Sequence, residues 1–292
     1  VGRSCLTPLI GARGGIAGDF TVTKLADDEF MIIGGGMSER YHSRFWKMVP
    51  LPAGTTFESR TDEMCGFNVA GPRSRELLGR LTNADLTTAA FPFMRSQRIE
   101  IAGVPVIALR VSFTGDLGWE LHCAQSDQVA LYQALLEAGQ AVGAGPVGSR
   151  ALMSLRVEKG YGSWSREYSP EYWPQEVGLD RLIKLDKRFL HKDKYLQVKD
   201  IVAREVLSLI HVQDVTDADA TGGEPVFLPD GTPVGRVTSG TYGYGVEMAL
   251  ALGYLRGVAG GTEVDVMILG KPHRGVVLAE PPFDPKGEKL RA

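Results

Sequence analysis

The chain has 292 residues, long enough for two domains, and its 43% hydrophobic and 23% charged residues are typical of folded globular proteins. The formal net charge of −3 argues against a nucleic-acid-binding protein, which normally carries a basic surface. No apolar run reaches the roughly 18 residues that a membrane span needs, and the N-terminus lacks a secretory signal. These features predict a soluble intracellular protein, located in the cytoplasm or, in a eukaryote, in the mitochondrial matrix.

The first two thirds of the chain mix predicted strands and helices. Strands are predicted where apolar and polar residues alternate, at 20–25, 29–33, 98–101, 104–112 and 119–123. Helices are predicted where apolar residues recur at helical spacing, at 37–49, from Gly71-Pro72 to Leu81, and at 150–159. A further helix is predicted to begin at a cap residue, Ser126, and to carry an apolar stripe of Val129, Tyr132, Leu135 and Leu136. Because strands and helices do not alternate regularly, the pattern favours an α+β arrangement over a doubly wound sheet.

The last third of the chain has a different character. A basic, polar connector at 187–199 leads into short strand-like runs at 206–212, 234–238, 248–255, 263–269 and 274–279. Turn residues such as PDG at 229–231 separate these runs. Short strands with regular turns predict a small antiparallel barrel or sandwich. We therefore expect an α+β domain over residues 1–198 and a β domain over 199–292.

Several common chemistries find little support in the motifs. The stretch GARGGIAG does not satisfy the GxGxxG dinucleotide pattern, and GGGM at 34–37 lacks the Lys-Ser/Thr of a phosphate loop. The five histidines show no metal-binding spacing, the three cysteines form no CxxC pair, and no GxSxG motif is present. Hydride transfer, metal-dependent hydrolysis and acyl transfer are thus disfavoured, and no metal is expected.

Carboxylates in unusual surroundings remain as candidates. Asp19 stands between the glycine-rich loop and a strand, and Glu120 lies inside the predicted strand WELHC. Strand interiors are poor places for glutamate, although Glu120 could simply be the solvent-facing member of an alternating pair. Glu158 and Glu176 also lie in short conspicuous motifs, SLRVEKGY and PQEVGLD.

Six motifs occur in an order that resembles the aminomethyltransferase family, which includes the T-protein of the glycine-cleavage system. They are GGIAGDFTVTKL, FNVAGPRSRELL, SFTGDLGWELHC, SLRVEKGY with EVGLDRLIKLDK, GRVTSGTYG with GYLR, and AEPPFDP. The chain is most similar to the C-terminal folate domains of dimethylglycine and sarcosine dehydrogenases. The resemblance covers essentially the whole chain, and it implies that an opening strand–helix segment of the family domain is missing.

The resemblance implies a fold, a cofactor and two site residues. The family has ferredoxin-like α+β modules and a C-terminal antiparallel β-barrel, and it binds tetrahydrofolate in a central channel. Asp19 aligns with the carboxylate that faces the folate nitrogens, where it would stabilise developing positive charge and relay a proton. Glu120 aligns with the glutamate that accepts two hydrogen bonds from the pterin edge. We expect a reduced pterin to contact both side chains.

Other folate-contacting positions of the family differ in this chain. Leu6 stands where the family has a tyrosine, Gly34 where it has an asparagine, and Phe113 where it has a second tyrosine. Arg150 lies two places before the position of a family arginine. Strict glycine-cleavage activity is therefore not expected. Tyr161, Trp164 and Trp173 are the residues that we expect to supply replacement contacts.

The implied activity is one-carbon transfer to tetrahydrofolate. The carbon would be an iminium or formaldehyde carbon released by demethylation of an N-methyl amine, captured as 5,10-methylenetetrahydrofolate. Such a domain would serve a flavin-dependent or other oxidative domain or subunit. One alternative is transfer of an intact methyl group from a sulfonium or methoxy donor. Another is a noncatalytic folate-binding assembly factor, disfavoured because KGYGSWSREY lacks the cysteine of that group's motif.

Overall fold

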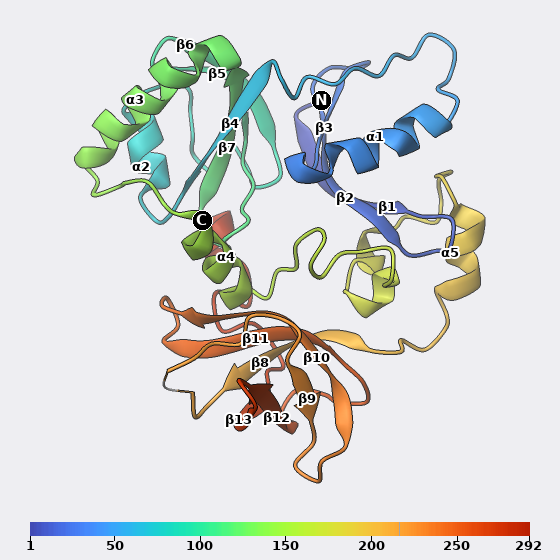
Figure 1. Cartoon of the computed structure of the whole chain (residues 1–292). Coiled ribbons are helices and arrows are strands. Elements are labelled where there is room, and N and C mark those ends of the chain that lie inside the picture. Colours follow the sequence, from blue (N-terminus) through green and yellow to red (C-terminus); the bar gives the residue numbers. More distant parts are fainter. Residues whose placement is uncertain (216) are drawn as a thin grey trace. The chain divides into compact units, whose positions relative to one another are not determined.

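A computed structural model of the chain describes residues 1–215 and 217–292 (Figure 1). The chain divides into two compact units, each with its own hydrophobic core. Unit 1 comprises Val1–Leu6, Phe20–Val147 and Gly287–Ala292; unit 2 comprises Thr7–Asp19 and Gly148–Lys286. Within the described residues, no helix combines the length and apolar character needed to cross a bilayer.

A four-stranded antiparallel sheet forms the centre of unit 1. Its strands, in spatial order, are β4 (Met64–Ala70), β7 (Gly118–Ala124), β6 (Val104–Leu109) and β5 (Ser96–Ile101). The helices α2 (Ser74–Gly79) and α3 (Gln128–Gln140) cover one face of it (Figure 1). Side chains alternate across a strand, so Trp119, Leu121 and Cys123 of β7 enter the core while Glu120 and His122 lie on the other face, which we call the open face.

A smaller sheet begins the chain. Its order is β1 (Arg3–Ile10), β2 (Ile16–Lys24) and β3 (Phe30–Ile33), and the helix α1 (Glu39–Met48) follows. The buried Phe20 of β2 anchors α1, because its ring lies 4.8 Å from that of His42 and 5.9 Å from that of Trp46. The short helix α6 (Glu288–Arg291) also belongs to unit 1.

Unit 2 contains a closed antiparallel barrel. Its strands are β8 (Val206–Val212), β9 (Pro225–Phe227), β10 (Pro233–Gly243), β11 (Met248–Leu255), β12 (Glu263–Ile268) and β13 (Lys271–Val277), closed in the order β10-β11-β8-β13-β12-β9. Closure removes the unpaired sheet edges that invite aggregation. The helix α4 (Ser149–Glu158) packs on the outside of the barrel through Val157, which joins Leu209, Leu250 and Leu252. The helix α5 (Lys192–Val198) precedes β8.

A buried ion pair connects α4, the segment after it and the barrel. Arg156 and Glu167 are almost fully buried, and Arg156 Nη1 lies 2.9 Å from Glu167 Oε2. The other carboxylate oxygen accepts hydrogen bonds from the hydroxyls of Thr238 and Ser239 on β10, at 2.7 and 2.6 Å. Ser163 N–H donates a further bond to Oε2 at 2.9 Å. Four donors thus satisfy one buried carboxylate.

The α+β fold with a C-terminal barrel is confirmed, as are most predicted elements. β8 and β11 have the predicted bounds, whereas β1, β4, β9 and α5 were not predicted. The predicted cap at Ser126 is wrong: a 3₁₀ turn precedes α3, whose N-terminus has no side-chain cap. The predicted apolar stripe is wrong in part, because Leu131 and Leu135 are buried whereas Val129 and Tyr132 are exposed. The boundary at 198/199 stays a prediction.

Loss of the Glu167 carboxylate should destabilise the protein strongly. Glu167→Ala leaves the Arg156 guanidinium buried without its partner, which should lower the free energy of unfolding by about 3–5 kcal/mol in urea titrations. Glu63→Ala is the matched control, because the exposed Arg60–Glu63 pair should contribute little. Equal stability of the two variants would contradict a structural role for the buried pair.

Candidate functional site

Asp19 is a half-buried carboxylate on β2, at the end of the first segment of unit 2. Its Oδ1 atom is buried and has no hydrogen-bond partner among the described residues. Burial raises the pKa of Asp19 from 3.8 to about 7, against the opposing effect of a backbone hydrogen bond. The group is therefore poised to exchange a proton near neutral pH, as expected of a general acid or base.

The backbone around Asp19 is set by contacts with residues 170–172. Ile16 N–H donates a 3.0 Å hydrogen bond to the carbonyl of Tyr172. A Cβ atom on Gly15 would lie 2.5 Å from the carbonyl oxygen of Pro170, so only glycine permits this approach. Gly15 thus serves close backbone packing.

Tyr168 is a buried neighbour of Asp19 that the sequence analysis did not single out. Burial, and next the charge of Asp19, raise the pKa of Tyr168 to about 12. Its ring fits against Gly162, where a Cβ atom would lie 2.6 Å from Cε1. Trp164 forms an isolated β-bridge with Tyr168. The glycine in YGSW is the sequence feature that could have indicated this aromatic packing.

Glu120 lies half-buried on the open face of the unit 1 sheet. In the strand register it faces Asn68 of β4 on one side and Leu109 of β6 on the other. Its Oε2 atom is 3.5 Å from Nε2 of His122, two residues along the same strand. Gly66 lies opposite His122, and a Cβ atom there would be 3.1 Å from Nδ1. A glycine therefore makes room for the imidazole beside the carboxylate.

Neither Asn68 nor His122 was predicted as a site residue. The alternation in WELHC places His122 on the same face as Glu120, which was the available signal. Asn68 could be paired with Glu120 only after β4, which was not predicted, had been recognised.

The other predicted site residues are distributed over both units. Leu6, Gly34 and Phe113 belong to unit 1 with Glu120, whereas Arg150, Tyr161 and Trp164 belong to unit 2 with Asp19. Arg150 is exposed at the start of α4. A Cβ atom on Gly34 would lie 2.8 Å from the ring of Phe20, so this glycine is required for packing. The carbonyl of Tyr161 accepts a 2.8 Å hydrogen bond from Arg156.

Three further residues highlighted by their motifs have structural partners. The guanidinium of Arg204 lies 4.4 Å from the centroid of the Trp173 ring. The same guanidinium holds the buried Glu176 through Nε and Nη2, both at 2.9 Å. Burial alone would raise the pKa of Glu176, but these hydrogen bonds hold it below its usual value. Glu158 accepts a 3.1 Å hydrogen bond from Gly245 N–H.

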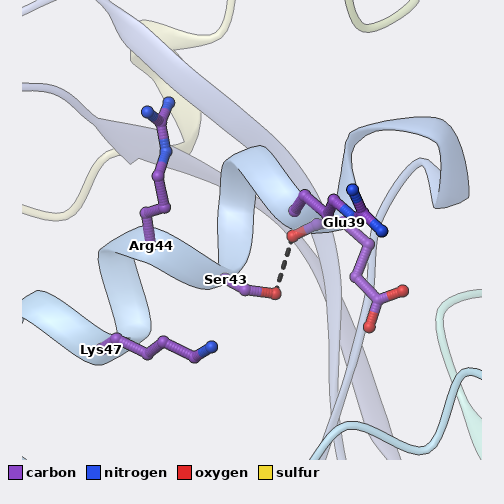
Figure 2. Close-up of a pocket in the computed structure, with 5 residues that line it drawn as sticks. Glu39, Ser43, Arg44 and Lys47 are labelled. Atoms are coloured by element: carbon purple, nitrogen blue, oxygen red, sulfur yellow. Dashed lines mark hydrogen bonds between the residues drawn. The ribbon is translucent and has the colours of Figure 1, made fainter.

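Two surface hollows of unit 1 contain none of the predicted site residues. One, of about 310 Å³, is lined by Glu39, Arg40, Ser43, Arg44 and Lys47 of α1. Figure 2 shows Arg44 extending away from the Ser43–Glu39 hydrogen bond, and the figure labels none of the predicted site residues. The other, of about 520 Å³, is lined by residues 79–84 and 98–100. The described residues also contain no cluster of three or more metal-ligating side chains.

Comparison with known proteins gives a consistent result over both parts of the chain. The family model of the GCVT N-terminal domain matches residues 1–187, and that of the glycine cleavage T-protein C-terminal barrel domain matches residues 206–284. Human mitochondrial dimethylglycine dehydrogenase is 34% identical over 288 residues, which are 96% of this chain and 33% of the relative. The 4-methylaminobutanoate oxidase (formaldehyde-forming) of Paenarthrobacter nicotinovorans is 32% identical, over 99% of this chain and 35% of the relative.

The chain thus spans about a third of the length of these relatives. Among solved structures, the glycine cleavage system aminomethyltransferase T of Bartonella henselae has the same fold. Its TM-score is 0.83 at 22% identity, over 98% of this chain and 77% of that one. The chain therefore belongs to the glycine-cleavage T-protein, or aminomethyltransferase, family.

Proposed function

We propose that the chain is a tetrahydrofolate-dependent one-carbon transferase domain. It captures an iminium or formaldehyde carbon from the demethylation of an N-methyl amine as 5,10-methylenetetrahydrofolate. The observation that carries this proposal is the Asp19 carboxylate, which has a buried oxygen without a partner and a pKa near neutrality. Relatives named as a dimethylglycine dehydrogenase and as a formaldehyde-forming oxidase support the choice of carbon source.

The reduced pterin supplies the two nitrogens that receive the carbon, and the chain supplies the proton chemistry. In its ionised form Asp19 can accept a proton from the acceptor amine, and it can stabilise positive charge that develops nearby. Because one carboxylate oxygen has no hydrogen bond to lose, protonation does not disrupt other contacts of the described residues. The raised pKa makes the carboxylate a stronger base than an exposed aspartate.

Glu120 suits recognition of the pterin edge. That edge presents an N–H and an amino group side by side, and a carboxylate can accept both hydrogen bonds. The side chain of Glu120 is 26% exposed, and the neighbouring positions on β4 include the polar Asn68 and the small Gly66. We propose that Leu6, Gly34 and Phe113 of unit 1 and Arg150, Tyr161 and Trp164 of unit 2 also contact folate.

We further propose that residues 1–198 form the folate-binding domain and residues 199–292 the barrel domain. The partner that fits this activity is a flavin-dependent or other demethylating domain or subunit. The iminium or formaldehyde that this partner releases would be the immediate source of the carbon.

Product analysis tests the proposed reaction. With ¹³C-formaldehyde and tetrahydrofolate, the chain should accelerate formation of 5,10-methylenetetrahydrofolate above the uncatalysed condensation, as followed by NMR. A 5-methyl product formed from a sulfonium or methoxy donor would instead establish methyl transfer. Folate binding with no acceleration from either donor would establish a noncatalytic role.

Replacing the Asp19 carboxylate should remove proton transfer but preserve folate affinity. Asp19→Asn should lower kcat about 10²-fold or more, since general acid–base assistance is worth about 10²–10⁴. In the wild type kcat should fall as the pH drops through about 7, because the carboxyl becomes protonated, and this limb should vanish in the variant. Asp28→Asn, at an exposed turn, is the control. An unchanged rate in Asp19→Asn would remove this residue from the mechanism.

Replacing the Glu120 carboxylate should weaken binding. Glu120→Gln loses one acceptor and the charge, so calorimetric titration with tetrahydrofolate should show a loss of about 1.5–3 kcal/mol. Glu100→Gln changes an exposed glutamate on β5 of the same sheet and should leave the Kd unchanged. If Glu120→Gln binds as tightly as the wild type, Glu120 does not recognise the pterin.

A further inference from the structure

Two of the three cysteines lie side by side on adjacent strands of the unit 1 sheet. Cys65 of β4 and Cys123 of β7 are direct partners in the strand register, and their Sγ atoms are 3.3 Å apart. Residues directly opposite on antiparallel strands have Cα atoms about 4.5–5.5 Å apart. That separation lies within the range of about 4.4–6.8 Å that disulfides span. The backbone therefore already has the geometry that a bond between these sulfur atoms requires.

We propose that Cys65 and Cys123 form an oxidisable dithiol, a modification site at which a hydroperoxide installs an intramolecular disulfide. An odd number of cysteines, three in this chain, is untypical of a disulfide framework, and both residues are thiols in the structure. A reversible bond that forms only under oxidation is compatible with both observations. This inference does not depend on the proposed folate chemistry.

The reaction balances with one equivalent of hydroperoxide. The sulfur of Cys65 attacks the O–O bond and becomes a sulfenic acid, while the leaving oxygen departs as water after taking a proton. The sulfur of Cys123 then attacks the Cys65 sulfur, the S–S bond forms, and the sulfenic oxygen leaves as a second water. Two thiols lose two protons and two electrons, and these reduce hydrogen peroxide to two molecules of water.

The two cysteines have different surroundings, and this difference indicates which of them reacts with the hydroperoxide first. Cys65 is half-buried at the margin of the core, whereas Cys123 is 2% exposed. Burial, together with the hydrogen bond to Cys65, raises the pKa of Cys123 to about 12. The thiolate is the reactive form, so Cys65 meets the oxidant and Cys123 resolves the sulfenic acid.

The bond would fix two strands that carry candidate site residues. Cys65 and Cys123 are 58 residues apart in the sequence, so the crosslink closes a long loop. On the same pair of strands, the Asn68–Glu120 pair lies three positions away. Because the cysteines point into the core and Glu120 lies on the open face, oxidation can occur without occupying that face.

The test uses the full chain carrying Cys5→Ser, which removes the exposed third cysteine and leaves the core unchanged. After hydrogen peroxide treatment, quenching, unfolding and alkylation, both remaining thiols should be protected and the intact mass should fall by about 2 Da. Non-reducing peptide mapping should give one crosslinked peptide containing Cys65 and Cys123. Dithiothreitol should restore both alkylation sites.

Single variants in the same background provide the matched controls. Cys65→Ser and Cys123→Ser should form no intramolecular crosslink, and Cys65 in the latter should gain oxygen in steps of about 16 Da. If the Cys5→Ser protein keeps both thiols open to alkylation, or gains oxygen at Cys65 without the crosslinked peptide, the proposal is wrong. The deciding result comes from the Cys5→Ser protein, whose core is unchanged. It therefore does not depend on whether the Cys65→Ser and Cys123→Ser variants fold.

Discussion

Unit 2 depends on the buried ion pair between Arg156 and Glu167. Neither charge could remain in the interior without the other, and the hydroxyls of β10 complete the coordination of the carboxylate. Glu167 lies in the segment that continues to Tyr172, whose carbonyl accepts the hydrogen bond from Ile16. Ile16 is three residues before Asp19. The segment 167–172 therefore carries both the buried ion pair and a backbone contact to the strand that bears the proposed catalytic carboxylate.

Unit 1 positions its carboxylate in a different way. The alternation of β7 sends Trp119 and Leu121 into the core and leaves Glu120 on the open face. Gly66, opposite His122 on the neighbouring strand β4, leaves space for the imidazole to lie beside Glu120. Core packing and the proposed ligand recognition thus belong to opposite faces of one strand, so a single-residue shift in register would exchange them.

Much of this architecture could be predicted from the sequence where the local pattern and the tertiary environment agree. The barrel strands β8 and β11 were predicted with their observed bounds, because apolar runs and turn residues mark both ends. β4 was missed although Cys65, Phe67 and Val69 alternate with Gly66 and Asn68, because glycine and asparagine are uncommon in strands. α5 was missed because it is short and charged; its stability comes from burial of Tyr195 and from Gln175, which donates to the carbonyl of Val198. Such long-range contacts leave no local signature.

The site was predictable to the same extent. Asp19 stands out in the sequence as a carboxylate between a glycine-rich loop and a strand, and Glu120 as a carboxylate inside a strand. Tyr168 and Asn68 become neighbours of these groups only through burial and strand register. Gly34 was named because it aligns with a folate-contacting asparagine of the family. The structure shows in addition that the ring of Phe20 occupies the space that a side chain at this position would need.

Burial of Asp19 has a thermodynamic cost, apart from the chemical role proposed for it. An aspartate whose pKa is about 7 when folded and near 3.8 when unfolded binds its proton more tightly in the native state. Between these two values the native protein holds more protons than the unfolded chain, so this residue favours folding less and less as the pH rises toward 7. In the proposed reaction the charged form of Asp19 is the active one, and it is also the form that the fold accommodates least well. Stability and turnover would therefore make opposite demands on this side chain.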